Sequence, residues 1–257
     1  MLLALDTGNS DTTIGLWDGE IWLHIWRIPT KPEQSELFYG IKLRDYFFEA
    51  NVDVATIEAI VLSSVVPVLT EKLKGVIEIL FGKKPIVLGP PIYKKLSIEV
   101  LNPYEIGADL VSNAIAAYDY YKSTCIVVDF GTALTFTTLS PTGRILGVSI
   151  APGLMTAIKS LTQNTAKLFD VPLQMPASVL GTSTITAIQS GILFGYNGLV
   201  KSMVNEIRKE LKEDCPAIAT GGLSPVITPL HDFFDRVEPN LTLNGLRIVG
   251  ETIKVNG

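Results

Sequence analysis

Residues 1–20 read MLLALDTGNSDTTIGLWDGE, and their alternation of apolar runs and polar turns predicts how the fold begins. Residues 1–5 form an apolar run that is typical of a buried strand. A polar turn, Asp6-Thr7-Gly8-Asn9-Ser10, follows it, and the apolar pattern resumes at residues 12–17. Asp18-Gly19 is a strong hairpin signal. We therefore expect a strand, a polar turn, a second strand, a hairpin and a third strand near residues 20–28.

The polar turn has the residue types of a phosphate-binding loop. Gly8 lets the backbone approach an anion closely, and Asn9, Ser10 and Thr12 supply neutral hydrogen-bond donors. Asp6 ends a buried strand, where an unpaired carboxylate is costly, and a metal-bound phosphate would resolve that cost. An ordinary Asx turn explains the same residues equally well. By itself, this turn leaves both interpretations open.

The second half of the chain contains an internal echo of this turn. Residues 125–144 read CIVVDFGTALTFTTLSPTGR, which again predicts a strand, an Asp-x-Gly turn, a second strand and a hairpin. The equivalent residues are Asp6 and Asp129, Gly8 and Gly131, Asn9 and Thr132, and Thr12 and Thr135. Repeats usually mean repeated structural units. We therefore expect two similar domains, residues 1–121 and 122–257, which each offer such a turn to a shared cleft.

Composition limits the class of protein. The chain has 257 residues, of which 47% are apolar and 18% charged, so it can bury a sizeable core. A net charge of −5 argues against general binding to nucleic acid or to an anionic membrane, and no apolar segment is long enough to span a bilayer. Cys125 and Cys215 have no metal-ligand spacing, so a reduced cytoplasmic chain is the simplest expectation, with a bridge between them left open.

The remaining segments alternate between strand and helix patterns. We expect further strands near residues 57–63, 85–88, 96–100, 134–139, 144–150 and 216–220. We expect helices near residues 33–50, 67–80, 154–161, 185–212 and 245–253, and one that has Asp109 in its first turn and ends near residue 121. Residues 162–180 are predicted to be a polar connector. The helix at 185–212 has apolar side chains at helical spacing, which fit either a core or a dimer interface.

Two local features allow both a structural and a functional interpretation. Asp109 falls in the first turn of its helix, where the helix dipole favours a carboxylate. The alternative is that Asp109 points into the cleft, on the helix face that it shares with Asn113. Gly221-Gly222 follows a strand, where it would either let the backbone approach a flat ligand such as adenine or allow tight packing.

Six segments together resemble a type III pantothenate kinase, a member of the acetate and sugar kinase/heat-shock/actin superfamily. They are Asp6-Thr7-Gly8-Asn9-Ser10, Ser63-Ser64-Val65-Val66-Pro67, Asn102-Pro103 through Gly107-Ala108-Asp109, Asp129-Phe130-Gly131-Thr132-Ala133, Pro152-Gly153 and Thr220-Gly221-Gly222. Their order and spacing fit that family over essentially the whole chain. The resemblance implies an α/β fold of two actin-like (ribonuclease H-like) halves, each a mixed sheet flanked by helices.

The resemblance also implies an activity, which is the ATP-dependent phosphorylation of pantothenate, the first step of coenzyme A synthesis. The implied ATP-binding residues are Asp6, Thr7, Gly8, Asn9, Ser10, Asp11, Thr12, Thr13 and Thr132. The implied substrate-binding residues are Gly107, Ala108, Asp109, Leu110 and Thr184. Asp109 would be the catalytic base, and Thr184 would reach the substrate of the partner subunit in a homodimer. Magnesium (Mg²⁺) would accompany ATP near Asp6, and Asp129 would hold a monovalent cation, potassium (K⁺) or ammonium (NH₄⁺).

The sequence departs from the family pattern at four positions. Leu110 replaces the usual Arg, Val148 a usual Gly and Thr182 a usual Lys, and the family's Asp near Thr137 is absent. Because Arg is a bidentate partner for carboxylate or phosphate, Leu cannot take its place. Three interpretations follow: an active pantothenate kinase with an altered site, a catalytically weak accessory or regulatory relative that binds nucleotide or pantothenate, and a kinase for another small alcohol.

Overall fold

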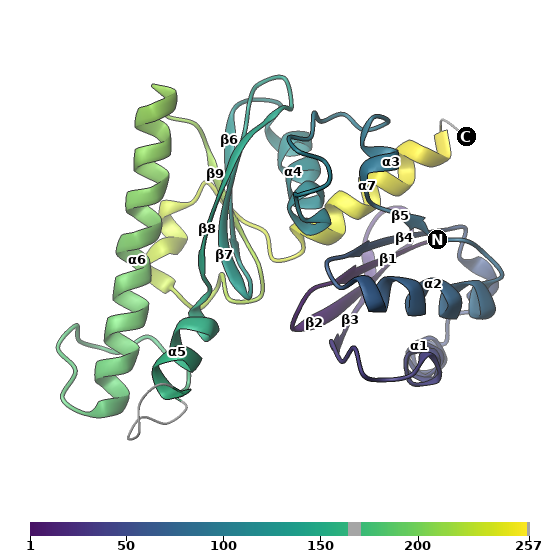
Figure 1. The fold of residues 1–257 in the computed structure, drawn as a ribbon, viewed down its shortest axis with the longest axis horizontal. Coiled ribbons are helices and arrows are strands. Elements are labelled where there is room, and N and C mark those ends of the chain that lie inside the picture. The colour runs from purple at the N-terminus through teal and green to yellow at the C-terminus, as the bar shows by residue number, and fades with distance from the viewer. Residues whose placement is uncertain (164–170, 256–257) are drawn as a thin grey trace. The chain divides into compact units, whose positions relative to one another are not determined.

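The computed structural model describes residues 1–163 and 171–255, and the chain forms two compact units (Figure 1). The first unit comprises Met1–Ala116 with Leu241–Gly257, and the second is Ala117–Asn240. The expected boundary after residue 121 lies close to the observed one. The expectation differs at the end of the chain, where α7 (Leu241–Val255) belongs to the first unit. Trp22 explains this placement in part, because its Nε1 donates a hydrogen bond to Oδ1 of Asn244 in α7 (2.8 Å).

The first unit is built on a five-stranded sheet in the order β3-β2-β1-β4-β5. Its strands are β1 (Leu2–Thr7), β2 (Asp11–Trp17), β3 (Trp22–Pro29), β4 (Ala59–Ser64) and β5 (Ile86–Val87). The first three strands are antiparallel, as the pattern of residues 1–20 predicted, whereas β4 runs parallel to β1 and β5 parallel to β4. The carboxyl ends of β1, β4 and β5 therefore meet at one edge of the sheet.

Helices cover both faces of this sheet because side chains alternate along each strand. Leu3 and Leu5 share one core with α1 (Glu36–Glu49) and α2 (Pro67–Phe81), which lie side by side (Figure 1). Ser35 caps α1 by accepting a hydrogen bond from the backbone N–H of Phe38 (3.3 Å), and Pro67 begins α2, as expected. On the opposite face, α7 packs against β1 and β4.

The second unit repeats this arrangement, which confirms the internal echo. Its sheet has the order β10-β9-β6-β7-β8. The strands are β6 (Cys125–Phe130), β7 (Ala133–Leu139), β8 (Ile145–Pro152), β9 (Ala217–Thr220) and β10 (Arg236–Val237). Here β6, β7 and β8 are antiparallel, and β9 is parallel to β6. The second unit thus corresponds strand by strand to β1, β2, β3, β4 and β5 of the first.

The helices of the second unit are α5 (Leu154–Gln163) and α6 (Thr184–Leu211). The predicted apolar stripe of α6 packs into the core of this unit, with Ile188 and Ile192 buried and Leu199, Met203 and Ile207 partly buried against them. Of the two expectations for that stripe, the core role is therefore the one observed. Part of the predicted connector, residues 164–170, lies outside the described residues.

Some local predictions were wrong. The strand expected near residues 96–100 is absent from the described structure, and α3 (Pro90–Tyr93) precedes this region. The sequence signals also missed the 3-10 helices η1 (Val54–Thr56) and η2 (Thr228–Phe233) and the short strand β10. The helix after Gly107 is α4 (Ala108–Tyr121), as expected, and it passes from the first unit into the second.

Both cysteines are free and buried, so the bridge that the sequence left open is not formed. Cys215 belongs to the core around α6 together with Ile126 and Val128. Because Cys125 precedes Ile126 in the same strand, its side chain points to the other face of the sheet. Among the described residues, no helix is both long and apolar enough to cross a membrane.

Candidate active site

The polar turn after β1 is closed by backbone hydrogen bonds and is tied to the end of β3. The N–H of Gly8 donates to the carbonyl oxygen of Asp11 (3.0 Å), and the N–H of Thr30 donates to that of Ser10 (2.8 Å). The hydroxyl of Thr30 donates to the carbonyl oxygen of Gly8 (2.8 Å). An added Cβ at Gly8 would lie 3.3 Å from the Asp11 carbonyl oxygen, so a larger residue would crowd the turn.

The residues implied to bind ATP divide into two groups by exposure. Thr7 and Thr12 are fully buried, and the hydroxyl of Thr12 lies within hydrogen-bonding distance of those of Thr7 (3.5 Å) and Thr30 (3.3 Å). These two side chains therefore hold the turn together from inside. Asn9, Ser10 and Asp11 are exposed, so they and the surrounding backbone form the part of the turn that a phosphate can reach.

Asp6 stands in a row of polar side chains that crosses three strands, which we call the Asp6 row: Thr13, Asp6 and Ser63. Asp6 is paired with Thr13 of β2 and with Ser63 of β4, so the three side chains emerge on the same face of the sheet. Ser63 is fully buried, and its hydroxyl has no hydrogen-bond partner among the described residues. A buried hydroxyl of this kind normally has a partner. Oxygen donors next to a carboxylate fit Mg²⁺, which keeps most of its water ligands.

Asp109 lies at the same edge of the first sheet. The N–H of Val65 donates to the carbonyl oxygen of Thr7 (3.0 Å) and so extends the pairing of β1 with β4. An added Cβ at Gly107 would lie 3.6 Å from Cγ1 of Val65 and would collide with Oδ1 of Asp109. The start of α4 is thus packed against the carboxyl end of β4. The polar turn, the Asp6 row and the start of α4 with Asp109 therefore lie at the same edge of the first sheet, although they are far apart in the chain.

Burial raises the pKa of Asp109 above its ordinary value, although the backbone N–H groups of Leu110 and of Asp109 itself partly oppose the shift. The N–H of Leu110 donates to Oδ1 of Asp109 (2.8 Å). A carboxylate with a raised pKa is a stronger base than an exposed one, which suits proton transfer.

The neighbours of Asp109 in the implied substrate segment are apolar and inward-facing. Ala108 and Leu110 are each 8% exposed, and Leu110 continues into the buried stripe of α4 with Val111 and Ala114. Leu110 therefore contributes packing to this unit. Any polar recognition of an acceptor molecule near Asp109 must come from other side chains.

The second unit contains an equivalent row, which we call the Asp129 row: Thr135, Asp129 and Thr220. Asp129 is paired with Thr135 of β7 and with Thr220 of β9. These threonines are 7% and 1% exposed, and neither hydroxyl has a hydrogen-bond partner among the described residues. A carboxylate between two such hydroxyls is a set of oxygen donors of the kind that binds a hard cation. Sequence reasoning gave Asp129 a role but gave none to Thr220 or, in the other row, to Ser63, although both lie in segments that resemble the family, because they come from strands distant in the chain.

The backbone of Gly221 lies close against the Asp129 row. Its φ of +90° is in the left-handed region that favours glycine, and an added Cβ would collide with Oδ1 of Asp129 and lie 2.7 Å from the backbone N and C of Phe130. Of the two expectations for Gly221-Gly222, tight packing therefore describes Gly221.

Thr132 lies in the exposed turn that follows β6. Its carbonyl oxygen accepts hydrogen bonds from the N–H of Gly153 (3.1 Å) and from the hydroxyl of Thr156 in α5 (2.7 Å). An added Cβ at Gly153 would lie 2.5 Å from the same oxygen, which accounts for the glycine of the Pro152-Gly153 segment. The Thr132 side chain remains exposed and can reach a ligand.

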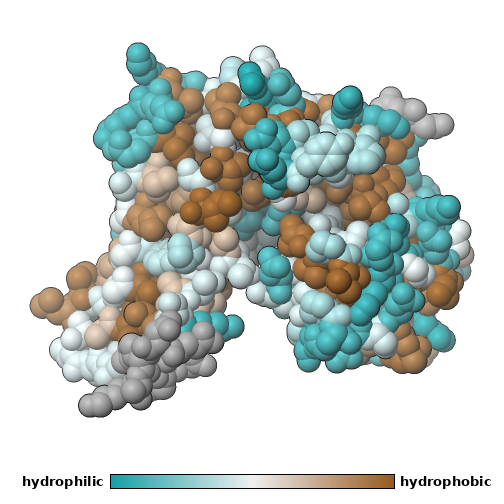
Figure 2. Space-filling view, in the orientation of Figure 1, coloured by the Kyte–Doolittle hydropathy of each residue, from teal (hydrophilic) through white to brown (hydrophobic). Residues whose placement is uncertain are grey.

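Thr184 is the first residue of α6 and is exposed. Ser183 caps the helix through a capping box with Thr186. Apolar side chains gather in this region (Figure 2), where Val179 is 60%, Leu180 80% and Ile185 39% exposed. Exposed apolar side chains that lie together often mark an interaction surface.

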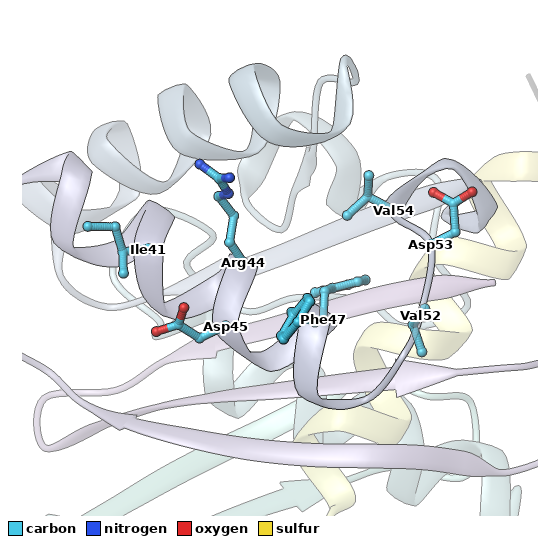
Figure 3. A pocket seen from close by; sticks show the side chains of 8 residues that line it. Ile41, Arg44, Asp45, Phe47, Val52, Asp53 and Val54 are labelled. Carbon is cyan, nitrogen blue, oxygen red and sulfur yellow. The ribbon is translucent and has the colours of Figure 1, made fainter.

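A surface pocket of the first unit does not contain any of these residues (Figure 3). It is lined by Ile41, Arg44, Asp45, Phe47, Phe48, Val52, Asp53 and Val54. Asp45 and Asp53 lie at opposite ends of it, and Asp53 is engaged in accepting a hydrogen bond from the N–H of Ala55 (2.9 Å). None of the residues that the family resemblance implicates lines this pocket. The sheet edge with Asp6 and Asp109 is therefore the better candidate site.

Comparisons with known proteins agree with this geometry. A family model described as Type III pantothenate kinase matches residues 2–206. The type III pantothenate kinase of Anaeromyxobacter sp. (strain K) is 40% identical over 251 residues, which are 98% of this chain and 99% of that protein. The one of Syntrophobacter fumaroxidans (strain DSM 10017 / MPOB) is 40% identical over 257 residues and covers 100% of both chains.

Solved structures share the fold at lower sequence identity. A conserved putative Baf family transcriptional activator from Campylobacter jejuni superposes with a TM-score of 0.58 and 21% identity, covering 99% of this chain and 98% of that chain. MreB 5 of Spiroplasma citri bound to AMPPNP gives a TM-score of 0.54 and 13% identity, covering 99% and 97%. These similarities confirm the expected α/β fold of two actin-like (ribonuclease H-like) halves.

Proposed function

Because this chain belongs to the type III pantothenate kinase family, we propose that it transfers the terminal phosphoryl group of ATP to the primary hydroxyl of pantothenate. This reaction is the first step of coenzyme A synthesis, and we place it in the cytoplasm. The observation that carries the proposal is the partly buried Asp109 carboxylate, whose pKa is raised, at the sheet edge that also holds the polar turn and the Asp6 row. The full-length similarity to enzymes of that name supports it.

Asp109 is the base in this proposal. Phosphoryl transfer has a loose transition state, so the enzyme acts mainly by positioning and by neutralising charge. A carboxylate that accepts a hydrogen bond from the acceptor hydroxyl orients its oxygen and takes the proton late in the transfer. The raised pKa of Asp109 increases its basicity, while the N–H of Leu110 fixes the position of Oδ1.

The polar turn binds the phosphates of ATP in this proposal. The turn segment, Asp6, Thr7, Gly8, Asn9, Ser10, Asp11, Thr12 and Thr13, offers backbone N–H groups and exposed side chains at Asn9 and Ser10. Mg²⁺ bound with ATP would neutralise the phosphate charge, and the oxygens of the Asp6 row would hold it through water. Thr132 contributes a further hydroxyl from the exposed turn of the second unit.

The Asp129 row holds a monovalent cation, K⁺ or NH₄⁺, in this proposal. Its support is chemical, because Asp129 supplies one negative charge and Thr135 and Thr220 supply two buried hydroxyl oxygens with no hydrogen-bond partner among the described residues. A cation would give both oxygens a partner. It would also fix the strand end from which the Thr132 turn begins.

We further propose a homodimer in which Thr184 reaches the acceptor bound to the partner subunit. The exposed apolar side chains of Val179, Leu180 and Ile185 next to Thr184 support self-association at this surface. Light scattering combined with an activity assay tests this, because a monomer with full activity at micromolar concentration would contradict it.

The decisive experiment measures ATP turnover with and without pantothenate. Turnover only with pantothenate is the expected result. Binding of nucleotide or pantothenate without turnover would instead indicate an accessory or regulatory relative. Turnover only with another small alcohol would indicate a kinase of different specificity.

A further inference from the structure

Tyr93 is a buried tyrosine at the sheet edge that carries Asp109. It is the last residue of α3, and its side chain is 5% exposed. Helix α3 begins shortly after β5, whose Val87 is paired with Leu62 of β4. The N–H of Leu88 continues this pairing by donating to the carbonyl oxygen of Leu62 (2.8 Å). Tyr93 therefore follows the carboxyl end of β5, directly beside the end of β4 against which Gly107 packs.

The electrostatics agree with this placement. Burial, and secondarily the negative charge of Asp109, raise the pKa of Tyr93 to about 12. The phenol is therefore protonated at neutral pH, which makes it a neutral hydrogen-bond donor in the neighbourhood of an acceptor-only carboxylate. No hydrogen bond to its hydroxyl is formed within the part of the chain that the structure describes. Although the Tyr93 side chain is 5% exposed, its hydroxyl is not among the fully buried polar atoms that lack a partner, so this donor can reach a ligand.

The composition of the site makes such a donor useful. Pantothenate carries oxygen acceptors along its whole length, and Asp109 cannot donate to them when it is ionised. Leu110, at the position where the family pattern has an Arg, is packed inward and offers no hydrogen bond. A polar side chain on a neighbouring element must therefore supply the missing donor.

We propose that Tyr93 is a specificity-determining residue that donates a hydrogen bond to an oxygen of pantothenate next to the reacting hydroxyl. The proposal rests on the proposed function. Asp109 accepts from the reacting hydroxyl, while Tyr93 donates to the adjacent oxygen, so the two side chains together select a molecule with both groups. This contact is present before and during phosphoryl transfer, and so it affects binding of the acceptor more than the rate of the chemical step.

The test compares Tyr93→Phe with Tyr104→Phe as a matched control. Phe keeps the buried ring of Tyr93, and Tyr104 lies in the segment between α3 and α4 but is 91% exposed. We expect Tyr93→Phe to raise the KM for pantothenate by about 3- to 10-fold, the loss of one neutral hydrogen bond. The KM for ATP and kcat should stay within about twofold, and Tyr104→Phe should match the wild type.

A second measurement does not depend on turnover. Pantothenate should raise the melting temperature of the wild type more than that of Tyr93→Phe, while the two ligand-free proteins melt alike. An unchanged pantothenate KM in Tyr93→Phe would overturn the inference, and so would a fall in kcat at constant KM, which would mean that Tyr93 acts through Asp109. If the wild type itself shows no pantothenate-dependent turnover, the proposed function fails and the inference with it.

Discussion

The Asp6 row and the Asp129 row occupy the same position in two equivalent sheets, yet their surroundings differ. In both, an aspartate at the end of the first strand of its unit stands between a hydroxyl from the next strand and one from a parallel strand. In the Asp129 row both threonines are buried without a hydrogen-bond partner among the described residues. Of the two hydroxyls in the Asp6 row, only that of Ser63 is in that state, because Thr13 is partly exposed.

Under the proposal that each row holds a cation, this difference predicts two ways of holding it. A row with a partly exposed member admits water, which suits an ion such as Mg²⁺ that keeps several water ligands. A closed row with two unsatisfied hydroxyls offers its own oxygens instead, which suits an ion that has lost most of its water. The repeated motif therefore need not mean repeated chemistry, and the neighbours of each aspartate set its role.

The largest expected effect concerns Asp109. Asp109→Asn should lower kcat by roughly 100-fold or more, the scale of removing a general base. Asp119→Asn is a matched control, since Asp119 lies in the same helix and forms an exposed pair with Lys122 (2.8 Å). Unchanged turnover in Asp109→Asn, measured at saturating ATP and pantothenate, would remove the catalytic role.

The same variant has a predicted effect on stability. The folded protein binds the Asp109 proton more tightly than the unfolded chain, because burial raises its pKa. The stability that this group contributes is therefore present at low pH and is lost as the pH rises through the raised pKa. Asp109→Asn should consequently not lower the melting temperature at neutral pH, and a clear decrease there would contradict the role of burial. Wild-type turnover should fall on acidification because Asp109 becomes protonated. The midpoint of that fall should lie above the pKa of an ordinary aspartate.

The next effect compares the glycines near the two rows. Gly221→Ala should destabilise the protein by about 2 kcal/mol, since its backbone is in the left-handed region and its Cβ would meet Asp129 and Phe130. Gly8→Ala should cost less, about 1 kcal/mol or below, because its nearest obstacle is the Asp11 carbonyl oxygen at 3.3 Å. Urea denaturation measures both, and equal losses would show that the two turns are equally tight.

Ion dependence distinguishes the rows directly. Asp129→Asn should abolish activation by K⁺ or NH₄⁺, and we expect removal of these ions from the wild type to lower turnover by about tenfold, equivalent to about 1.4 kcal/mol. Asp6→Asn should instead raise the Mg²⁺ concentration needed for half-maximal rate while leaving activation by K⁺ intact. Equal wild-type rates in potassium, ammonium and sodium buffers would count against the cation site.

The smallest effect concerns the buried hydroxyls. Without a cation, Thr220→Val should stabilise the protein by up to about 1 kcal/mol, because it removes an unsatisfied buried hydroxyl and nearly keeps its shape. The rise in melting temperature that K⁺ causes in the wild type should shrink in this variant. Ser63→Ala serves as the counterpart in the Asp6 row and should leave that potassium effect unchanged. A full potassium effect in Thr220→Val would exclude Thr220 as a ligand.

The sequence predicted much of the fold because its strongest signals are local. Both Asp-x-Gly turns follow short apolar runs and lead into hairpins, and so the antiparallel part of each sheet could be read from neighbouring residues. Ser63 and Thr220 could not be assigned in this way, because they reach their aspartates through parallel pairing with distant strands. The strand expected at residues 96–100 failed for a related reason, since alternation of side chains does not by itself supply a partner strand.

The sequence allowed the residues of the candidate site to be named as expectations, but it did not give their arrangement. Asp6, Asp109 and Asp129 each follow a recognisable motif, but the sequence gives no distance between motifs. Tyr93 lacked any signal, because an isolated tyrosine after two prolines suggests only a loop. Its burial beside Asp109 depends on where β5 places α3, and that is a tertiary property.

The return of α7 to the first sheet has a consequence for synthesis on the ribosome. The second unit is one continuous segment, Ala117–Asn240, and all of it emerges before residue 241 does. The first unit is made first but lacks the helix that covers β1 and β4 until residues 241–255 are added. Domains generally fold as units while the chain is still growing. In this protein the half that is synthesised first is therefore the half that finishes folding last, with one face of its sheet unprotected in the meantime.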